Sequence, residues 1–325
     1  MDAWLPLTAG ATLLYLGAEW FVSGASALAL ALRIPQLLIG LTVVAYGTSA
    51  PEIVVGVAAA MDGHGGVALG NVIGSNIANI GLILGISVLI RPAKVDASLR
   101  RRELPMMVAS ALLVPVVLWD GALQTWECAV LLTVAGGYTA WMAREARTTA
   151  RRRIAISDMQ LAEEAADAAG APSPKGKGRA MVVAMLGLGL LLLGGQLFVA
   201  GAVDLAQGLG LSERTIGLTV VALGTSLPEL VTSSIAARRG HSDLAVGNVV
   251  GSNIFNVLLC LGAAGLAGPV TGDLATYAPD LLVLLLFTAA AAAMIRRHRI
   301  IARWEGAVVL VAYLGVVALA LASPT

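Results

Sequence analysis

Charged residues are scarce in this sequence: only 13% of its 325 residues are Asp, Glu, Lys or Arg, whereas 58% are hydrophobic. A water-soluble domain needs a charged surface, and this chain has too few charges to cover one. Apolar stretches of about 20 residues recur along the chain, which is the length a helix needs to cross about 30 Å of hydrocarbon. The sequence therefore excludes a soluble globular protein and predicts a membrane protein that crosses the bilayer several times.

Cysteine is scarce as well, and several catalytic motifs do not occur. The two cysteines, Cys128 and Cys260, lie in apolar segments without paired spacing, so the sequence supports neither a disulfide framework nor a zinc site. It contains no G-x-x-x-x-G-K-[ST] phosphate-binding loop, which leaves an ATP-driven pump unsupported, and no H-E-x-x-H hydrolase motif. We therefore expect a protein that is not an enzyme, holds no cofactor and binds no nucleic acid.

Charged residues, prolines and glycines divide the chain into ten expected membrane helices. Five precede a long polar loop and five follow it, which predicts a first unit at 1–143, a cytoplasmic linker at 144–179 and a second unit at 180–325. The composition of the linker predicts a flexible segment with room for one short helix. The expected spans are 5–30, 36–61, 67–90, 103–119, 123–143, 180–207, 213–237, 244–268, 277–295 and 302–322.

The basic residues predict the orientation of the chain in the membrane. Of the 21 Lys and Arg residues, 20 fall in the odd-numbered loops between the expected spans or, for Arg303, at the edge of one, and only Arg214 borders an even-numbered loop. Loops rich in Lys and Arg stay on the cytoplasmic side. The odd-numbered loops are therefore expected in the cytoplasm, and both termini outside a multi-pass protein of the cell membrane.

An internal repeat relates the two units at an offset of 177 residues. Residues 40–80, GLTVVAYGTSAPEIVVGVAAAMDGHGGVALGNVIGSNIANI, align without a gap on residues 217–257, GLTVVALGTSLPELVTSSIAARRGHSDLAVGNVVGSNIFNV, with 25 identities in 41 positions. Because each unit has an odd number of expected spans, the two units enter the membrane in opposite directions. The expected fold is an all-α membrane protein with ten transmembrane helices in two inverted five-helix repeats, an architecture typical of alternating-access transporters.

Each repeat places a glutamate inside an apolar span, Glu52 in the first and Glu229 in the second. A carboxylate in hydrocarbon is costly unless it faces a cavity or a partner, and the expected spans contain no Lys or Arg beyond Arg214 and Arg303, which stand at the second residue of their spans. On a helix, Thr48, Ser49 and Glu52 share one face because they are three and four residues apart. Oxygen ligands of this kind suit hard cations such as Ca²⁺ and Na⁺, so we predict a cation site that uses both glutamates. The second repeat has the same arrangement in Thr225, Ser226 and Glu229.

Further residues of the repeat add oxygen atoms to the predicted site. Pro51 and Pro228 lack an N–H, so each breaks its helix and frees a backbone carbonyl one turn earlier. Taken singly, such a proline is a kink and a serine is a local hydrogen bond, and the buried glutamate pair is what favours a cation site. A serine and an asparagine four residues apart also project from one helix face in each repeat, Ser75 with Asn79 and Ser252 with Asn256.

Other polar residues in the spans have plainer interpretations. Glu19 lies in the first expected span, but the equivalent residue of the second repeat is Gln196. We therefore interpret Glu19 as local polar packing or the wall of a cavity. Four further asparagines are expected to join helices or cap them: Asn71, Asn76, Asn248 and Asn253.

The motif pair GTSAPE…GNVIGSNIAN and GTSLPE…GNVVGSNIFN resembles the two alpha-repeats of the calcium/cation antiporter superfamily, in particular its prokaryotic sodium/calcium exchangers. The resemblance covers essentially the whole chain. It implies that the second, third, seventh and eighth expected helices form a site that binds one Ca²⁺ or several monovalent cations in turn. It also implies that the first and sixth helices slide across this core to alternate access.

The resemblance also implies roles for individual residues. Glu52 and Glu229 would be the central Ca²⁺ carboxylates, and Thr48 and Thr225 would offer backbone carbonyls to the same ion. Flanking sites for monovalent cations would use the side chains or backbone carbonyls of Ser49, Ser75, Ser226, Ser252, Ala45 and Ala222.

One position departs from the pattern of the exchangers. They usually carry Asn in the first repeat and Asp in the second at the end of G-S-N-I-x-[ND], whereas this chain has Asn79 and Asn256. Two glutamates balance one Ca²⁺ or two monovalent cations, and a third Na⁺ would leave an unbalanced charge in a low-dielectric site. We therefore expect about two counter-ions for each Ca²⁺, with Na⁺ and H⁺ both open as the counter-ion.

The sequence predicts an antiporter that exchanges Ca²⁺ for Na⁺ or H⁺ by alternating access, with inorganic cations and the lipid bilayer as its partners. Two alternatives stay open within membrane transport, namely a monovalent cation/H⁺ antiporter and a cation channel. A membrane scaffold that transports nothing is a third. We expect one chain to function as a monomer.

Overall fold

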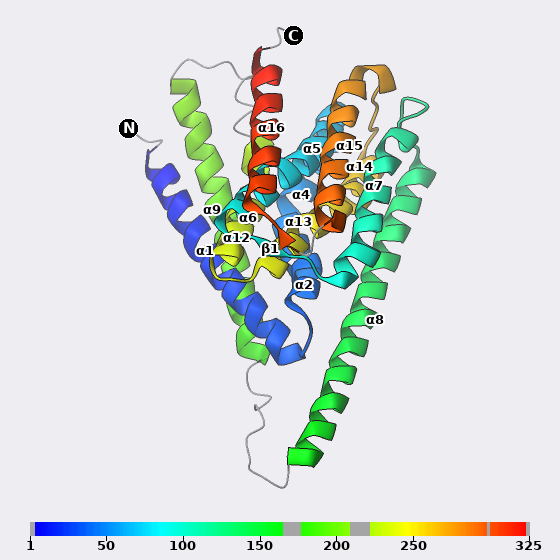
Figure 1. The fold of residues 1–325 in the computed structure, drawn as a ribbon. Coiled ribbons are helices and arrows are strands. Elements are labelled where there is room, and N and C mark those ends of the chain that lie inside the picture. The colour runs from blue at the N-terminus through cyan, green and yellow to red at the C-terminus, as the bar shows by residue number, and fades with distance from the viewer. Residues whose placement is uncertain (1–3, 165–176, 209–221, 298–299, 323–325) are drawn as a thin grey trace.

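The computed structural model describes residues 4–164, 177–208, 222–297 and 300–322. The described chain is a bundle of helices in which two long helices, α1 and α9, lie along one side and the longest helix, α8, along another (Figure 1). Strands are limited, in these ranges, to a pair of two residues each, β1 (Ala93–Lys94) and β2 (Ile300–Ile301), which pair antiparallel.

The first expected span is one continuous helix, and the second is broken. α1 runs over Trp4–Leu32. The second span consists of α2 (Gln36–Ile39), the π-helical segment η1 (Gly40–Val44) and α3 (Ala45–Thr48), followed by α4 (Ala50–Met61). The chain bends by 41° between α3 and α4, because Pro51 begins a new helix and cannot donate to the preceding turn.

The remaining helices of the first half follow the expected order. The third span is built from α5 (Gly65–Ala78), η2 (Asn79–Leu84) and α6 (Gly85–Ile90). The fourth consists of η3 (Leu99–Glu103) and α7 (Leu104–Val117), and the fifth is α8 (Thr125–Glu164). α8 thus continues well past residue 143, where the linker was expected to begin, so the first part of the predicted linker is helical.

The second half repeats this pattern, although residues 213–221 of its expected seventh span lie outside the described ranges. α9 (Lys177–Gly208) is followed by α11 (Ala222–Thr225) and α12 (Leu227–Arg238). The eighth span consists of α13 (Ser242–Phe255), η6 (Asn256–Leu261) and α14 (Gly262–Ala267). The last two spans are α15 (Leu274–Arg297) and α16 (Arg303–Ala322).

The two repeats break and turn at equivalent residues. Ser49 interrupts the helix before α4, and Ser226, 177 positions later, interrupts it before α12. α4 and α12 each have 12 residues, and both end at a turn with a left-handed glycine, Gly63 at φ 79° and Gly240 at φ 88°. The same local sequence therefore folds in the same way in both halves.

Helix lengths establish an all-helical membrane protein. Over the described residues, six helices are long and apolar enough to cross a membrane, or seven if the bent pair Gln36–Thr48 and Ala50–Met61 is one span. The expected fourth and fifth spans are not among these helices, and residues 213–221 of the expected seventh span lie outside the described ranges. The expected total of ten spans therefore stays a prediction.

α1 and α9 pack against each other as an antiparallel pair through glycines. Gly10 contacts the backbone at Phe198, and Gly24 contacts the backbone at Ala184, so the two helices run in opposite directions. Small residues allow helix backbones to approach closely where water supplies no driving force. A separate hydrophobic cluster forms around this pair, with Phe21 of α1 among its fully buried side chains.

We predict that a larger side chain at Gly187 destabilises the protein. A Cβ atom there would meet the backbone of Phe21 and Gly17, and overpacking of this kind costs about 1–3 kcal/mol. Gly187→Leu should therefore lower the thermal unfolding midpoint of the detergent-solubilised protein. Gly189→Leu, two residues along α9, is the control because nothing lies within 4 Å of its Cβ position. Equal midpoints for the two variants would contradict the glycine-mediated packing.

Candidate cation site

Glu52 and Glu229 lie at equivalent breaks in two helices. Each is in the first turn of the helix after the break, Glu52 in α4 and Glu229 in α12, next to a proline at the helix start. Both side chains are buried, with 1% exposed. Negative charge is favoured at this end of a helix, because the unpaired backbone N–H groups and the helix dipole are positive there.

Serines of each repeat bind the glutamate of the other repeat. Ser49 Oγ donates to Glu229 Oε1 at 2.9 Å, and Ser226 Oγ donates to Glu52 Oε1 at 3.2 Å. The two hydrogen bonds are related by the 177-residue offset. The helix breaks therefore face each other, and each carboxylate is oriented by the opposite half of the chain.

The two remaining serines of the predicted site join the same cluster. Ser252 Oγ lies 3.1 Å from Ser49 Oγ, and Ser75 Oγ lies 3.4 Å from Ser226 Oγ. All four serines are buried. The structure thus brings six of the predicted residues together at one place, the two glutamates and the serines Ser49, Ser75, Ser226 and Ser252.

Each glutamate keeps one oxygen atom without a protein partner. Glu52 Oε2 and Glu229 Oε2 are buried and accept no hydrogen bond from any described residue. Neither carboxylate forms an ion pair within the described ranges, where the ion pairs involve Glu19 and Glu145. Two buried carboxylate oxygens without a cationic side chain beside them are suited to bind a cation.

The threonines and alanines of the predicted site lie next to this cluster in sequence. Thr48 is buried, and its hydroxyl donates to Val44 O at 3.1 Å and to Asn248 Oδ1 at 3.2 Å. The hydroxyl proton of Thr48 is thus engaged within the protein, and the role of its backbone carbonyl stays a prediction. Ala45 is buried at the start of α3; Ala222 begins α11, and Thr225 ends it.

Asn79 and Asn256 have different surroundings although they are equivalent in sequence. Asn256 Nδ2 donates to Asn76 Oδ1 at 3.1 Å, and Cys260 Sγ lies 3.5 Å from Asn256 Oδ1. Asn79 Oδ1 is buried and has no hydrogen-bond partner among the described residues. Of the two amides, Asn79 has the oxygen free for a cation, whereas Asn256 is occupied by other side chains.

The other asparagines hold helices together, as expected from the sequence. Asn71 Nδ2 donates to Glu52 O at 3.2 Å, and Asn76 Nδ2 donates to Asn253 O at 3.2 Å. Asn248 joins α13 to α12 through Ser233 Oγ, at 2.9 Å. Asn253 is the exception, because it donates to Val249 O within its own helix, at 2.8 Å.

The structure adds an aromatic contact that the sequence analysis did not predict. The ring of Tyr46, next to Ala45, lies 4.0 Å from that of Phe255, next to Asn256, and its hydroxyl bonds Thr139 of α8. The equivalent residues of the other repeat are Leu223 and Ala78. Aligning the two repeats at the 177-residue offset shows that only one of them has aromatic residues at these positions. The residue types alone do not show that the two rings lie in contact.

The structure corrects the interpretation of Glu19 drawn from the sequence. It forms ion pairs with Arg238 and Arg239, at the end of α12 and directly after it. It is therefore more than local polar packing or a cavity wall. No sequence pattern indicates these ion pairs, since the residues are some 220 positions apart.

Comparison with known proteins identifies the family. The family model described as sodium/calcium exchanger protein matches residues 3–144 and 179–322. The chain belongs to this family. Its relatives include the putative antiporter CaxA of Alkalimonas amylolytica, 39% identical over 94% of both chains. The sodium/calcium exchanger MaX1 of Methanosarcina acetivorans is 33% identical over 95% of both chains.

Solved structures of the family have the same fold. The sodium-calcium exchanger NCX_Mj, soaked with Na⁺ and Ca²⁺, superposes with a TM-score of 0.82, is 31% identical and covers 97% of both chains. These relatives are transporters, so membership of the sodium/calcium exchanger family excludes an enzymatic reading of the site.

Proposed function

We propose that this chain exchanges Ca²⁺ for Na⁺ across a cell membrane, with the transported cation bound between Glu52 and Glu229. One observation carries the proposal: two buried carboxylates face each other across two helix breaks, and each keeps an oxygen atom without a hydrogen-bond partner among the described residues. A charged residue in the middle of a membrane helix costs about 2.5–3.5 kcal/mol on insertion scales. A divalent cation between the glutamates offsets that cost for both at once.

The chemistry of the surrounding atoms supports a hard cation. Ca²⁺ takes six to eight oxygen ligands, and Na⁺ also prefers oxygen. Carboxylates, serine hydroxyls and backbone carbonyls freed at the two breaks supply such a set. In the proposed assignment Glu52, Glu229 and the carbonyls of Thr48 and Thr225 bind Ca²⁺, and the four serines with the carbonyls of Ala45 and Ala222 bind monovalent cations.

The proposed architecture is ten transmembrane helices in two inverted repeats with both termini outside. The family model supports two units because it matches two separate segments, interrupted at residues 145–178. The start of α1 and the end of α16 lie at the same end of the molecule (Figure 1), which is what an even number of crossings requires. The distribution of basic residues supports the sidedness.

Alternating access is the proposed mechanism. In it the α1–α9 pair slides across the core and opens the cluster of glutamates and serines to one side of the membrane at a time. The close glycine-mediated packing of α1 on α9 supports movement of this pair as one body. Because the same two glutamates balance either one Ca²⁺ or two monovalent cations, the two kinds of cation compete for the site, which couples their movements in opposite directions.

The charge of the site sets the proposed stoichiometry of two counter-ions for each Ca²⁺. Asn79 and Asn256 are neutral, so the two glutamates balance two monovalent cations and leave a third without a counter-charge. The proton is a second candidate counter-ion for the same reason, because two protons neutralise the two glutamates. A monovalent cation/H⁺ antiporter stays as the alternative in which Ca²⁺ is only an inhibitor.

We predict that Glu52→Gln and Glu229→Gln each abolish exchange. Each amide keeps the size of the side chain but removes half of the charge that balances Ca²⁺. Radiolabelled Ca²⁺ uptake into proteoliposomes, driven by an outward Na⁺ gradient, should fall to the level of protein-free vesicles. Asp62→Asn is the matched control, because Asp62 lies exposed just after α4 and should leave uptake unchanged. Undiminished uptake in the double glutamine variant would refute the site.

A channel and a scaffold give different results in the same vesicles. A cation channel passes Ca²⁺ down its own gradient without internal Na⁺ or H⁺. A scaffold passes none, and its behaviour does not depend on the two glutamates. Uptake that requires an internal counter-ion therefore separates an antiporter from both.

We predict that exchange is electroneutral, because two monovalent charges move against the two charges of one Ca²⁺. Clamping the membrane potential with K⁺ and valinomycin should then leave the final Ca²⁺ gradient unchanged. Asn256→Asp adds a carboxylate, admits a third monovalent cation and should make the same gradient sensitive to voltage. Voltage dependence in the unmodified protein, with three charges moving for each Ca²⁺, would overturn the two-for-one stoichiometry.

A further inference from the structure

We propose that four residues form an ion-pair latch that positions the α1–α9 pair against the core in one of the two transport states. The latch consists of Tyr15 and Glu19 of α1 together with Arg238 and Arg239 at the end of α12. The inference rests on the proposed alternating-access exchange and adds to it residues that set which side the cation site faces.

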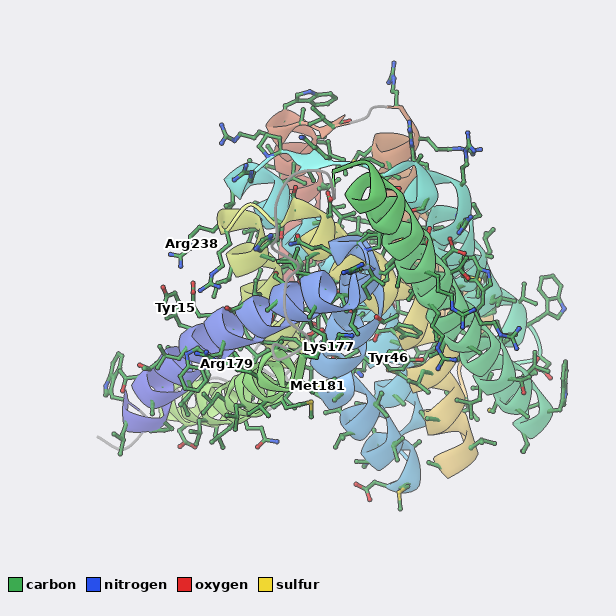
Figure 2. The ribbon with its side chains drawn as sticks, turned by 90° about the horizontal axis from the view of Figure 1, so that it is seen from below. Tyr15, Tyr46, Lys177, Arg179, Met181 and Arg238 are labelled. Carbon is green, nitrogen blue, oxygen red and sulfur yellow. The ribbon has the colours of Figure 1, made fainter. Side chains whose placement is uncertain are left out.

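The contacts of the latch use both carboxylate oxygens of Glu19. Arg238 donates to Oε1 and Arg239 donates to Oε2. Arg238 Nη2 also donates to the hydroxyl of Tyr15 at 3.0 Å, and its guanidinium lies 5.6 Å from the centre of the Tyr15 ring. Tyr15 and Glu19 are one helical turn apart and face the same way. Figure 2 shows Tyr15 and Arg238 close together at the edge of the molecule.

The two arginines pair with a carboxylate that is largely shielded from solvent. The Glu19 side chain is only 15% exposed. A carboxylate shielded in this way is costly without a cationic partner. Any displacement of α1 along its axis relative to α12 separates Glu19 from its partners, so the ion pairs favour the position of α1 seen in this structure.

The latch connects the two bodies that alternating access moves relative to each other. On one side it is attached to α1, which packs on α9 through glycines. On the other side it is attached to α12, the helix that carries Glu229 in its first turn and Arg238 in its last. A displacement that opens the latch is therefore a displacement relative to a helix of the cation site.

The second repeat lacks an equivalent latch. At the 177-residue offset, Leu192 replaces Tyr15 and Gln196 replaces Glu19, whereas Met61 and Asp62 stand for Arg238 and Arg239. No pair of opposite charges exists among those four residues. When the two inverted halves exchange conformations during transport, the latch is closed in one state and has no counterpart in the other. It consequently biases the equilibrium between the two states.

The test compares populations of the two states in the full-length protein. Spin labels at Leu30→Cys of α1 and Lys94→Cys of β1, both exposed sites, report the distance between the moving pair and the core in lipid nanodiscs. The native cysteines are both buried, so the labels react at the introduced sites. Pulsed electron resonance then gives the ratio of the two distance populations without any ion gradient.

Glu19→Gln gives α1 the residue that α9 has at the equivalent position. It should lower the population ratio of the observed state to the other by about 5- to 150-fold, the usual range for coupling between two states. The control Glu145→Gln removes an ion pair with Arg102 that does not involve α1, and should leave the ratio unchanged. The exchanged pair Glu19→Lys with Arg238→Glu should restore a large part of the ratio.

Two results would overturn the latch: an unchanged ratio in Glu19→Gln, or an equal change in Glu145→Gln. If Glu19→Gln does not fold, the exchanged pair decides. If the state seen in this structure predominates in the exchanged pair, the latch is supported. If the exchanged pair does not fold either, the contact is a static structural one and the latch is overturned. Because Glu19 does not touch the cation site, Ca²⁺ should still raise the thermal unfolding midpoint of Glu19→Gln. If the unmodified protein does not transport Ca²⁺ at all, the proposed exchange is refuted, and the distance measurement remains valid.

Discussion

The burial of two carboxylates at facing helix breaks is the constraint on which the structure of this protein depends. A serine of the opposite repeat donates to one oxygen of each glutamate, and in the proposed exchanger a cation would bind the other. The breaks themselves follow from Pro51 and Pro228, which end one helix and begin another. Charge balance, ion choice and coupling in the proposed exchanger all derive from this arrangement.

The internal repeat at the 177-residue offset explains how the chain builds such a site from one local sequence. Residues that share a helix face in the first half meet their own equivalents from the second half, so a single motif supplies both walls. The two halves nevertheless differ in several contacts. Among the described residues, Asn256 binds Asn76 whereas the side-chain oxygen of Asn79 has no partner. The Tyr46–Phe255 contact and the ion pairs of Glu19 likewise have no equivalent in the described part of the other half.

Features that repeat in the sequence could be predicted from it, and features that depend on unrelated segments could not. The 177-residue offset predicted the paired glutamates, the serines beside them and the breaks at Pro51 and Pro228, because identical residues impose identical local geometry. The length of α8 beyond residue 143 was missed, because a charged helix extending beyond the expected span has no apolar signal. The Glu19 ion pairs and the ring contact of Tyr46 were missed as well, because they join segments whose proximity only the tertiary structure shows.

The most direct test of the account is a calcium-binding titration of the purified protein by isothermal calorimetry. The account predicts one Ca²⁺ bound by each chain, displaced by Na⁺, and no measurable binding to Glu52→Gln or to Glu229→Gln when each is folded. Unchanged calcium binding in either variant, or no calcium binding by the unmodified protein, would contradict a cation site between the two glutamates.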